Sequence, residues 1–192
     1  MKKQFLTIAL TMTFGIFSMS LMAQEHDHSK MSMDHEMLKA PSHKVDVNFQ
    51  KQLNTVFQSS LKLNESFMTE DIATVKKAAM DVRDQIGKAD MMLLKGQAHM
   101  DWMNYLKTMN GGLDHIIEAA SINHQRTAFS QYNKGLYQSI KVFKIGETAY
   151  YQYCPMANNN KGAFWLSDSE QIKNPYMGAK MPKCGSVKET LK

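Results

Sequence analysis

The sequence contains only two cysteines and four prolines in 192 residues, and it has no large excess of either charge. Two cysteines are too few for a disulfide-rich scaffold or for a zinc module with four cysteine ligands. The 23 Lys and Arg residues against 18 Asp and Glu give a net charge of +5 that is mixed along the chain, which argues against a nucleic-acid partner. With 43% hydrophobic residues, the composition is that of a globular protein.

The motifs of several enzyme classes are also missing. We find no glycine-rich nucleotide-binding loop, no zinc-protease motif, no serine-hydrolase elbow and no site for covalent haem attachment. The Glu-x-x-His spacing of di-iron helical bundles occurs at Glu25–His28, outside the predicted helices. Cys154 as a thiol nucleophile would need a histidine and an orienting third group, and no such group is identifiable in the sequence. We therefore expect a protein that is not an enzyme.

Residues 1–23 have the pattern of a secretory signal peptide. Lys2 and Lys3 precede an apolar run from Phe5 to Leu21, and Ala23 suits the last position before cleavage. The run is short for a membrane span and no cysteine follows it, so we expect no stable membrane anchor after cleavage. The expected destination is the periplasm, an oxidising compartment in which two cysteines can form a bridge.

Residues 24–44 show no apolar periodicity, and we interpret them as a flexible tail. Over residues 45–146, four stripes of apolar side chains recur at helical spacing, which predicts an antiparallel four-helix bundle and an all-α fold class. Thr69–Asp71 and Ser121 suit helix starts, while Gly111-Gly112 within the third stripe predicts a kink or a break. The core positions of the stripes include Phe49, Leu53, Val56, Leu63, Phe67, Val75, Ala79, Val82, Ile86, Trp102, Leu106, Met109, Leu113, Ile116, Phe129, Tyr132, Leu136, Ile140 and Phe143.

After Gly146 the pattern becomes short, aromatic and rich in turns. Residues 150–153 and 163–166 resemble strands, and the Asn158–Gly162 segment between them suits a turn. We expect residues 147–192 to form a small, irregular β and loop cap that contains both cysteines and packs on the bundle.

The most unusual count is that of methionine, at 17. Thiolates and thioethers are soft ligands that select ions such as Cu(I), so a cluster of both near tight turns predicts a Cu(I) or Ag(I) site. The equally weighted alternative is a Cys154–Cys184 disulfide that stabilises the cap. The sulfur residues of the candidate metal site are Cys154, Met156, Met177, Met181 and Cys184.

Two further groups of residues are candidate ligands. The tail carries His and Met at close intervals and suits metal capture by a flexible chain, although these residues also suit a merely solubilising tail. His99 and Met103 lie four residues apart on a predicted helix face and could add ligands where the bundle meets the cap; the alternative is a hydrogen-bonded histidine at the core edge. The tail candidates are His26, His28, Met31, Met33, His35 and Met37.

Six ordered motifs over residues 45–190 resemble an uncharacterised domain family of Bacteroidetes-type bacteria. The motifs are His99-Met-x-Trp-Met103, Gln125-Arg126-x-x-Phe129, Tyr153-Cys-Pro-Met156, Gly162-Ala-x-Trp-Leu-Ser167, Asn174-Pro-Tyr-x-Gly178 and Met181-x-x-Cys-Gly185. Members of this family occur as free secreted proteins and fused to periplasmic adaptor subunits of copper and silver efflux pumps. Cys154-Pro-Met156 and Cys184-Gly185 are also weakly similar to a short heavy-metal-binding module, but Ala157 and Met181 replace two of its ligands.

The resemblance implies copper handling by association, with a pump adaptor as the partner. We therefore expect a periplasmic protein that buffers Cu(I) or Ag(I), or delivers it to heavy-metal efflux. The alternative is a structural or interaction module, a disulfide-stapled helical bundle that docks on an envelope partner.

Overall fold

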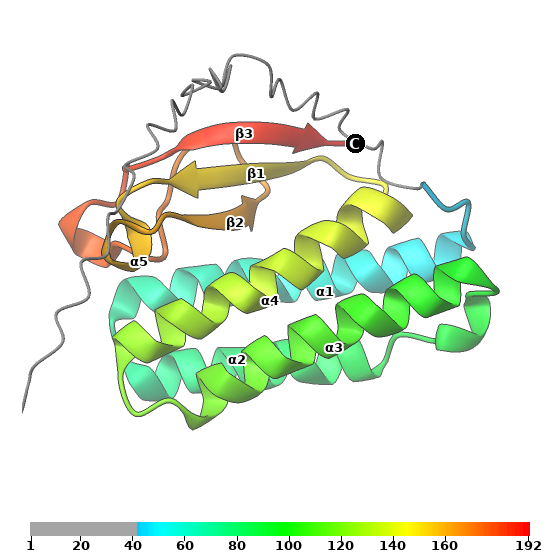
Figure 1. Ribbon diagram of the computed structural model, residues 1–192, viewed down its shortest axis with the longest axis horizontal. Helices are drawn as coiled ribbons and strands as arrows, with labels where there is room; N and C mark the ends of the chain where they lie inside the picture. Colours follow the sequence, from blue (N-terminus) through cyan, green and yellow to red (C-terminus); the bar gives the residue numbers. More distant parts are fainter. Residues whose placement is uncertain (1–41) are drawn as a thin grey trace, which may run out of the picture. The chain divides into compact units, whose positions relative to one another are not determined.

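The computed structural model describes residues 42–192, and the predicted leader and the candidate ligands of the tail lie outside them. Four main helices are packed pairwise, followed by a small three-stranded antiparallel sheet (Figure 1). The helices are α1 (Val47–Ser66), α2 (Ile72–Gly87), α3 (Gln97–Glu118) and α4 (Ile122–Phe143). Within residues 42–192, no helix combines the length and the apolar character that crossing a membrane requires.

The helix starts follow the capping residues of the sequence. The side chain of Asp46 accepts the Asn48 N–H at the start of α1, and that of Asp71 accepts the Thr74 N–H at the start of α2. The Ser121 hydroxyl accepts a hydrogen bond from His124 at the start of α4. Each of these bonds satisfies a backbone donor that the first helical turn leaves without a partner, so helix starts at Asp71 and Ser121 are confirmed.

Gly111 and Gly112 do not break α3, contrary to the sequence prediction, because the helix runs unbroken to Glu118. The two helices α3 and α4 instead approach closely at glycines. A Cβ on Gly112 would lie 2.5 Å from the backbone nitrogen of Tyr132, and one on Gly135 would lie 2.7 Å from Cγ of Met109. Glycine is required here because the neighbouring helix occupies the place of a side chain.

Large aromatic side chains fill the space between α1 and α4. Phe49 meets Phe143 edge-on with ring centroids 5.4 Å apart, and Phe67 lies 4.7 Å from Phe129. The Ser60 hydroxyl forms a buried hydrogen bond with that of Tyr132. Most of the predicted core positions are fully buried, but Leu106 is only partly buried.

The C-terminal part is more regular than the predicted cap, and the all-α class was too narrow. Its sheet has the strand order β2-β1-β3, with all neighbours antiparallel. The two predicted strands are present as β1 (Ala149–Cys154) and β2 (Ala163–Ser167), whereas β3 (Ser186–Leu191) lies in a segment interpreted as loop. Between β1 and β2, the short segment α5 (Ala157–Asn160) contains three asparagines with positive φ, so the chain turns there as predicted.

The sheet packs on the side of the helices formed by α4 and α1, with α2 and α3 on the far side (Figure 1). The Asn64 side chain of α1 donates to the carbonyl of Leu166 in β2 at 2.7 Å, and the Tyr137 hydroxyl of α4 bonds to Glu189 of β3 at 2.6 Å. Trp165 and Leu166 are buried in the same core as Phe129. Helices and sheet therefore stabilise one another.

Candidate functional site

The two cysteines, thirty positions apart in the sequence, meet at one end of the sheet. Cys154 is the last residue of β1 and is fully buried, whereas Cys184 precedes β3 and is half-buried. The pairing of Tyr153 with Ser186 brings the two strand ends together. Both residues are free thiols.

Gly185 makes this approach possible. Its φ of +141° is a backbone conformation that side-chain-bearing residues rarely adopt, and a Cβ there would lie 2.9 Å from both the Tyr153 carbonyl oxygen and the Trp165 ring. Because no side chain intervenes, the chain at Cys184 can pass directly beside the end of β1.

The two thiols are close enough to affect each other's protonation. A hydrogen bond with the Cys154 thiol raises the pKa of Cys184, and burial and charge repulsion from Cys154 raise it further. The backbone N–H of Met156 acts in the opposite direction, because it donates to the Cys184 sulfur and favours the thiolate. A metal ion that binds this pair must therefore displace the protons of the thiols.

The predicted methionine ligands lie around the cysteines to different degrees. Met156, at 44% exposure, and Met181, at 38%, are open to solvent, and both touch Cys184 through their backbones. The Cys184 N–H donates to the Met181 carbonyl at 3.2 Å. Met177 is half-buried and packs against the core. The structure thus brings Met156 and Met181 to the cysteine pair by their main chains, with side chains at the surface.

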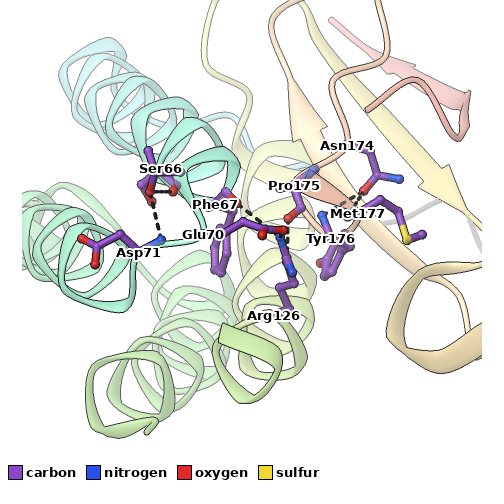
Figure 2. Close-up of polar contacts among 10 residues, drawn as sticks. Ser66, Phe67, Glu70, Asp71, Arg126, Asn174, Pro175, Tyr176 and Met177 are labelled. Atoms are coloured by element: carbon purple, nitrogen blue, oxygen red, sulfur yellow. Dashed lines mark hydrogen bonds and ion pairs between the residues drawn. The ribbon is translucent and has the colours of Figure 1, made fainter. Parts of the chain in front are cut away.

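Asn174 holds the loop that carries these residues, and it is fully buried. Its N–H donates to the Pro182 carbonyl at 2.8 Å and its side-chain amide to the Cys184 carbonyl at 2.7 Å. Its side-chain oxygen accepts the N–H groups of Tyr176 and Met177 (Figure 2). This role was not predicted, although the Asn174-Pro175 pair is a turn signal that marks the position.

Arg126 of α4 connects the same loop to the helices (Figure 2). Its side chain, 11% exposed, donates to the Pro175 carbonyl at 3.1 Å and to the Phe67 carbonyl at 3.3 Å, and it pairs with Glu70 at 3.3 Å. A Cβ on Gly178 would lie 2.7 Å from both charged groups of this pair, so the loop covers it closely. Arg126 therefore fixes the loop against the turn between α1 and α2.

His99 and Met103 lie far from the cysteines. They occupy the first turns of α3. The loop before Cys184 instead contacts the start of α4, where Arg126 bonds to Pro175 and Ser130 bonds to Tyr176, beside the far end of α3. His115 lies in the last turn of α3, sixteen residues after His99, so the two ends of the helix are about 24 Å apart. The structure does not bring this pair to where the cysteine-bearing loop meets the helices.

His43, assigned to the predicted tail, is part of the folded unit. Its Nε2 lies 2.7 Å from the Asp101 carboxylate, its N–H donates to the Val142 carbonyl, and its ring stacks on Phe143. The hydrogen bond from His43 lowers the pKa of Asp101. Across residues 42–192, no three His, Cys, Asp or Glu side chains converge on a common point. A metal site in this part of the chain must therefore use methionine sulfur or fewer than three of those ligands.

No curated protein matches this chain, and no solved structure does. One family model matches, over residues 56–148, and its description is a protein of unknown function, DUF3347. The match covers the second half of α1 and all of α2, α3 and α4, and it ends before β1. Both cysteines lie outside it. The helical part of the chain is therefore similar to the DUF3347 family, whose function is unknown.

Proposed function

We propose that the protein binds Cu(I) or Ag(I) at Cys154 and Cys184 and serves to buffer the ion or to deliver it to heavy-metal efflux. The observation that carries the proposal is the convergence of two free thiols at the end of β1. Thiolates with nearby thioethers favour soft monovalent ions over zinc, which is poorly bound by thioether sulfur. The cysteines thus act as ligands, not as catalytic groups.

The surroundings suit an ion that must enter and leave. Cys154 is fully buried, while Cys184 and the exposed Met156 and Met181 face the solvent side. An incoming ion would meet thioether sulfur first and then exchange onto the thiolates. Asn174 and Arg126 hold in place, by hydrogen bonds, the loop that carries Met177, Met181 and Cys184.

Location and partner follow from other parts of the sequence. The leader-like residues 1–23 support export to the periplasm, and the resemblance to domains fused to pump adaptors supports such an adaptor as the partner. The His- and Met-rich residues 24–44 would capture ions before transfer to the cysteines. His99 and Met103, with the other exposed methionines of this end, Met91, Met92 and Met100, would be a separate capture surface.

The same proximity of thiols favours a second function. In an oxidising compartment the pair can close to a disulfide, which would make the protein a stapled interaction module that binds no metal. Oxidation of the two thiols to a disulfide would have opposite consequences for the two functions. A ligand pair loses metal binding when oxidised, whereas a staple gains stability.

A competitive titration against a chromogenic Cu(I) chelator separates these functions. We expect the reduced mature protein to bind Cu(I) more tightly than the oxidised protein. Cys154→Ser or Cys184→Ser should weaken the binding by about tenfold or more, because a thiolate ligand is lost. Met156→Leu should weaken it less, and Met92→Leu, which changes an exposed methionine on another element, should leave the cysteine-dependent binding unchanged.

Equal Cu(I) affinity in the reduced, oxidised and serine-substituted proteins would contradict the ligand role. If, in addition, oxidation raised the unfolding temperature, the staple function would replace it. Residual weak binding in all variants would then report on the tail and on the separate capture surface around His99 and Met103.

A further inference from the structure

Two tyrosine rings stack on each other where the end of α4 meets the sheet. Tyr137 of α4 and Tyr151 of β1 have ring centroids 3.9 Å apart and planes only 16° from parallel. Tyr151 also stacks on Phe164 of β2, with centroids 4.6 Å apart and planes 11° from parallel. Among residues 42–192, which contain all seven tyrosines, Tyr137 and Tyr151 are the only two whose rings stack on each other. Two oxidisable phenols are therefore held face to face.

The Tyr137 hydroxyl lies between two charged groups. It donates to the Glu189 carboxylate of β3 at 2.6 Å, and it accepts a hydrogen bond from the Lys141 ammonium at 2.7 Å. Because an ammonium group can only donate, the phenol proton is directed at the carboxylate. Lys141 also pairs with Glu189 at 3.1 Å, which joins the three half-buried side chains into one network. An O–H bond of this length to a carboxylate is of the strong, charge-assisted kind.

This arrangement suits the loss of an electron together with a proton. Burial and the hydrogen bond to Glu189 raise the pKa of Tyr137, so the phenol keeps its proton at neutral pH. Removal of an electron makes a phenol strongly acidic, and the proton then needs an acceptor that is already in place. The Glu189 carboxylate lies within the hydrogen-bond reach that proton transfer to a base requires.

We propose that Tyr137 and Tyr151 are the site of an oxidative cross-link, a dityrosine, formed by a one-electron oxidant of the peroxidase class with hydrogen peroxide as the final electron acceptor. Each phenol loses one electron and one proton, that of Tyr137 to Glu189 and that of Tyr151 to water. The two radicals join through a bond between ring carbons next to the hydroxyls. The hydrogen on each joined carbon then moves to the oxygen of its own ring, which restores both phenols. One peroxide takes up the two electrons and two protons and becomes two water molecules.

The stacking supplies the proximity that this step needs. A radical on Tyr137 meets its partner without diffusion, because the faces of the two rings already lie against each other. The bond would join α4 to β1 across fourteen residues of sequence. The cross-link is independent of the proposed copper function, since it uses none of the cysteine or methionine side chains.

Oxidation of the full mature protein with a haem peroxidase and hydrogen peroxide tests the cross-link. We expect the blue fluorescence of dityrosine in the monomer after size-exclusion chromatography has removed any dimers. Trypsin should release residues 135–141 joined to residues 145–161, lighter by two hydrogen atoms than the two separate peptides. Fragmentation should place the link on Tyr151, although the second peptide also contains Tyr150 and Tyr153.

Three substitutions and a matched control test the roles of the residues. Tyr137→Phe and Tyr151→Phe should each abolish the cross-link in the monomer, and both keep a ring in the stack. Tyr150→Phe, the same change at the adjacent position of β1, should leave the yield unchanged. Glu189→Gln should slow the reaction by about tenfold or more, because an amide is a much weaker proton acceptor than a carboxylate.

Other results would overturn the proposal. These are dityrosine only in dimers, an equal yield from Tyr137→Phe protein, or a link on Tyr150 or Tyr153. An unchanged rate in Glu189→Gln protein that circular dichroism shows to be folded would contradict the role of the carboxylate. The peptide map of the unmodified protein decides the pairing even if one of the variants fails to fold.

Discussion

Replacing Gly112 with alanine is expected to destabilise the protein by about 3 kcal/mol or more, at the upper end of overpacking costs. The added Cβ would lie 2.5 Å from the backbone nitrogen of Tyr132 and 2.9 Å from its Cα. A backbone cannot rotate aside as a side chain can, so α3 and α4 must separate. That separation would loosen the contact around the fully buried Tyr132 and Met109.

Gly111→Ala is the matched control, because it changes the neighbouring residue of the same helix in the same way. Its Cβ would meet only the flexible end of the Gln131 side chain, at 2.9 Å. Helix propensity then dominates, and the substitution should be neutral or stabilising by up to about 1 kcal/mol. Urea unfolding of both variants measures the difference, and equal stability of the two would show that α3 and α4 do not pack as described.

Replacing Arg126 with leucine is expected to cost about 3 kcal/mol or more, because two hydrogen bonds from a charged donor are lost, each worth about 1.5–3 kcal/mol. The Pro175 and Phe67 carbonyls would lose their donor in a site that leucine cannot hydrate. We also expect a local effect. Amide hydrogen exchange should accelerate at residues 174–184, since Arg126 fixes this loop to the helices.

Glu70→Gln separates the contribution of the ion pair from that of the carbonyl contacts. The Glu70 side chain is 43% exposed, and exposed ion pairs contribute about 1 kcal/mol or less. This variant should therefore unfold almost as the unmodified protein does. If Arg126→Leu were as mild as Glu70→Gln, or if exchange at the loop did not change, the connecting role of Arg126 would be wrong.

The helices were predictable because their stripes are long and periodic and their caps are local signals. A pattern of apolar spacing repeated over five turns specifies which face of α1 or α4 is buried. Asp71 and Ser121 mark the starts of α2 and α4 within the sequence itself. The error at Gly111-Gly112 has a physical reason. Glycine weakens an isolated helix, but here close packing of α3 on α4 outweighs that propensity.

The strand β3 was missed because its stability is not local. Residues 186–191 alternate between exposed and partly buried positions along one edge of the sheet, so they lack the apolar run that marks a central strand. Its pairing with β1, and hence the meeting of Cys184 with Cys154, depends on contacts across the fold. The sequence indicated that both cysteines belong to one small unit, but it left their separation undetermined.

The residues that hold the cysteine-bearing loop in place could also not be predicted from the sequence. Asn174 and Arg126 act through carbonyl groups of Pro182, Cys184, Pro175 and Phe67, and a backbone acceptor carries no residue-type signal. His99 and Met103 illustrate the opposite case. They lie on one helix at the predicted spacing. Tertiary packing, however, decides which end of the helices contacts the cysteine-bearing loop.

X-ray absorption at the copper edge tests the central claim, that Cys154 and Cys184 together hold a soft ion, most directly. The reduced mature protein is loaded with less than one equivalent of Cu(I) and compared with the Cys154→Ser/Cys184→Ser variant. We predict a first shell of sulfur alone in the unmodified protein and its replacement in the variant by a shell that includes imidazole nitrogen from the tail. Identical spectra from the two proteins would contradict the account.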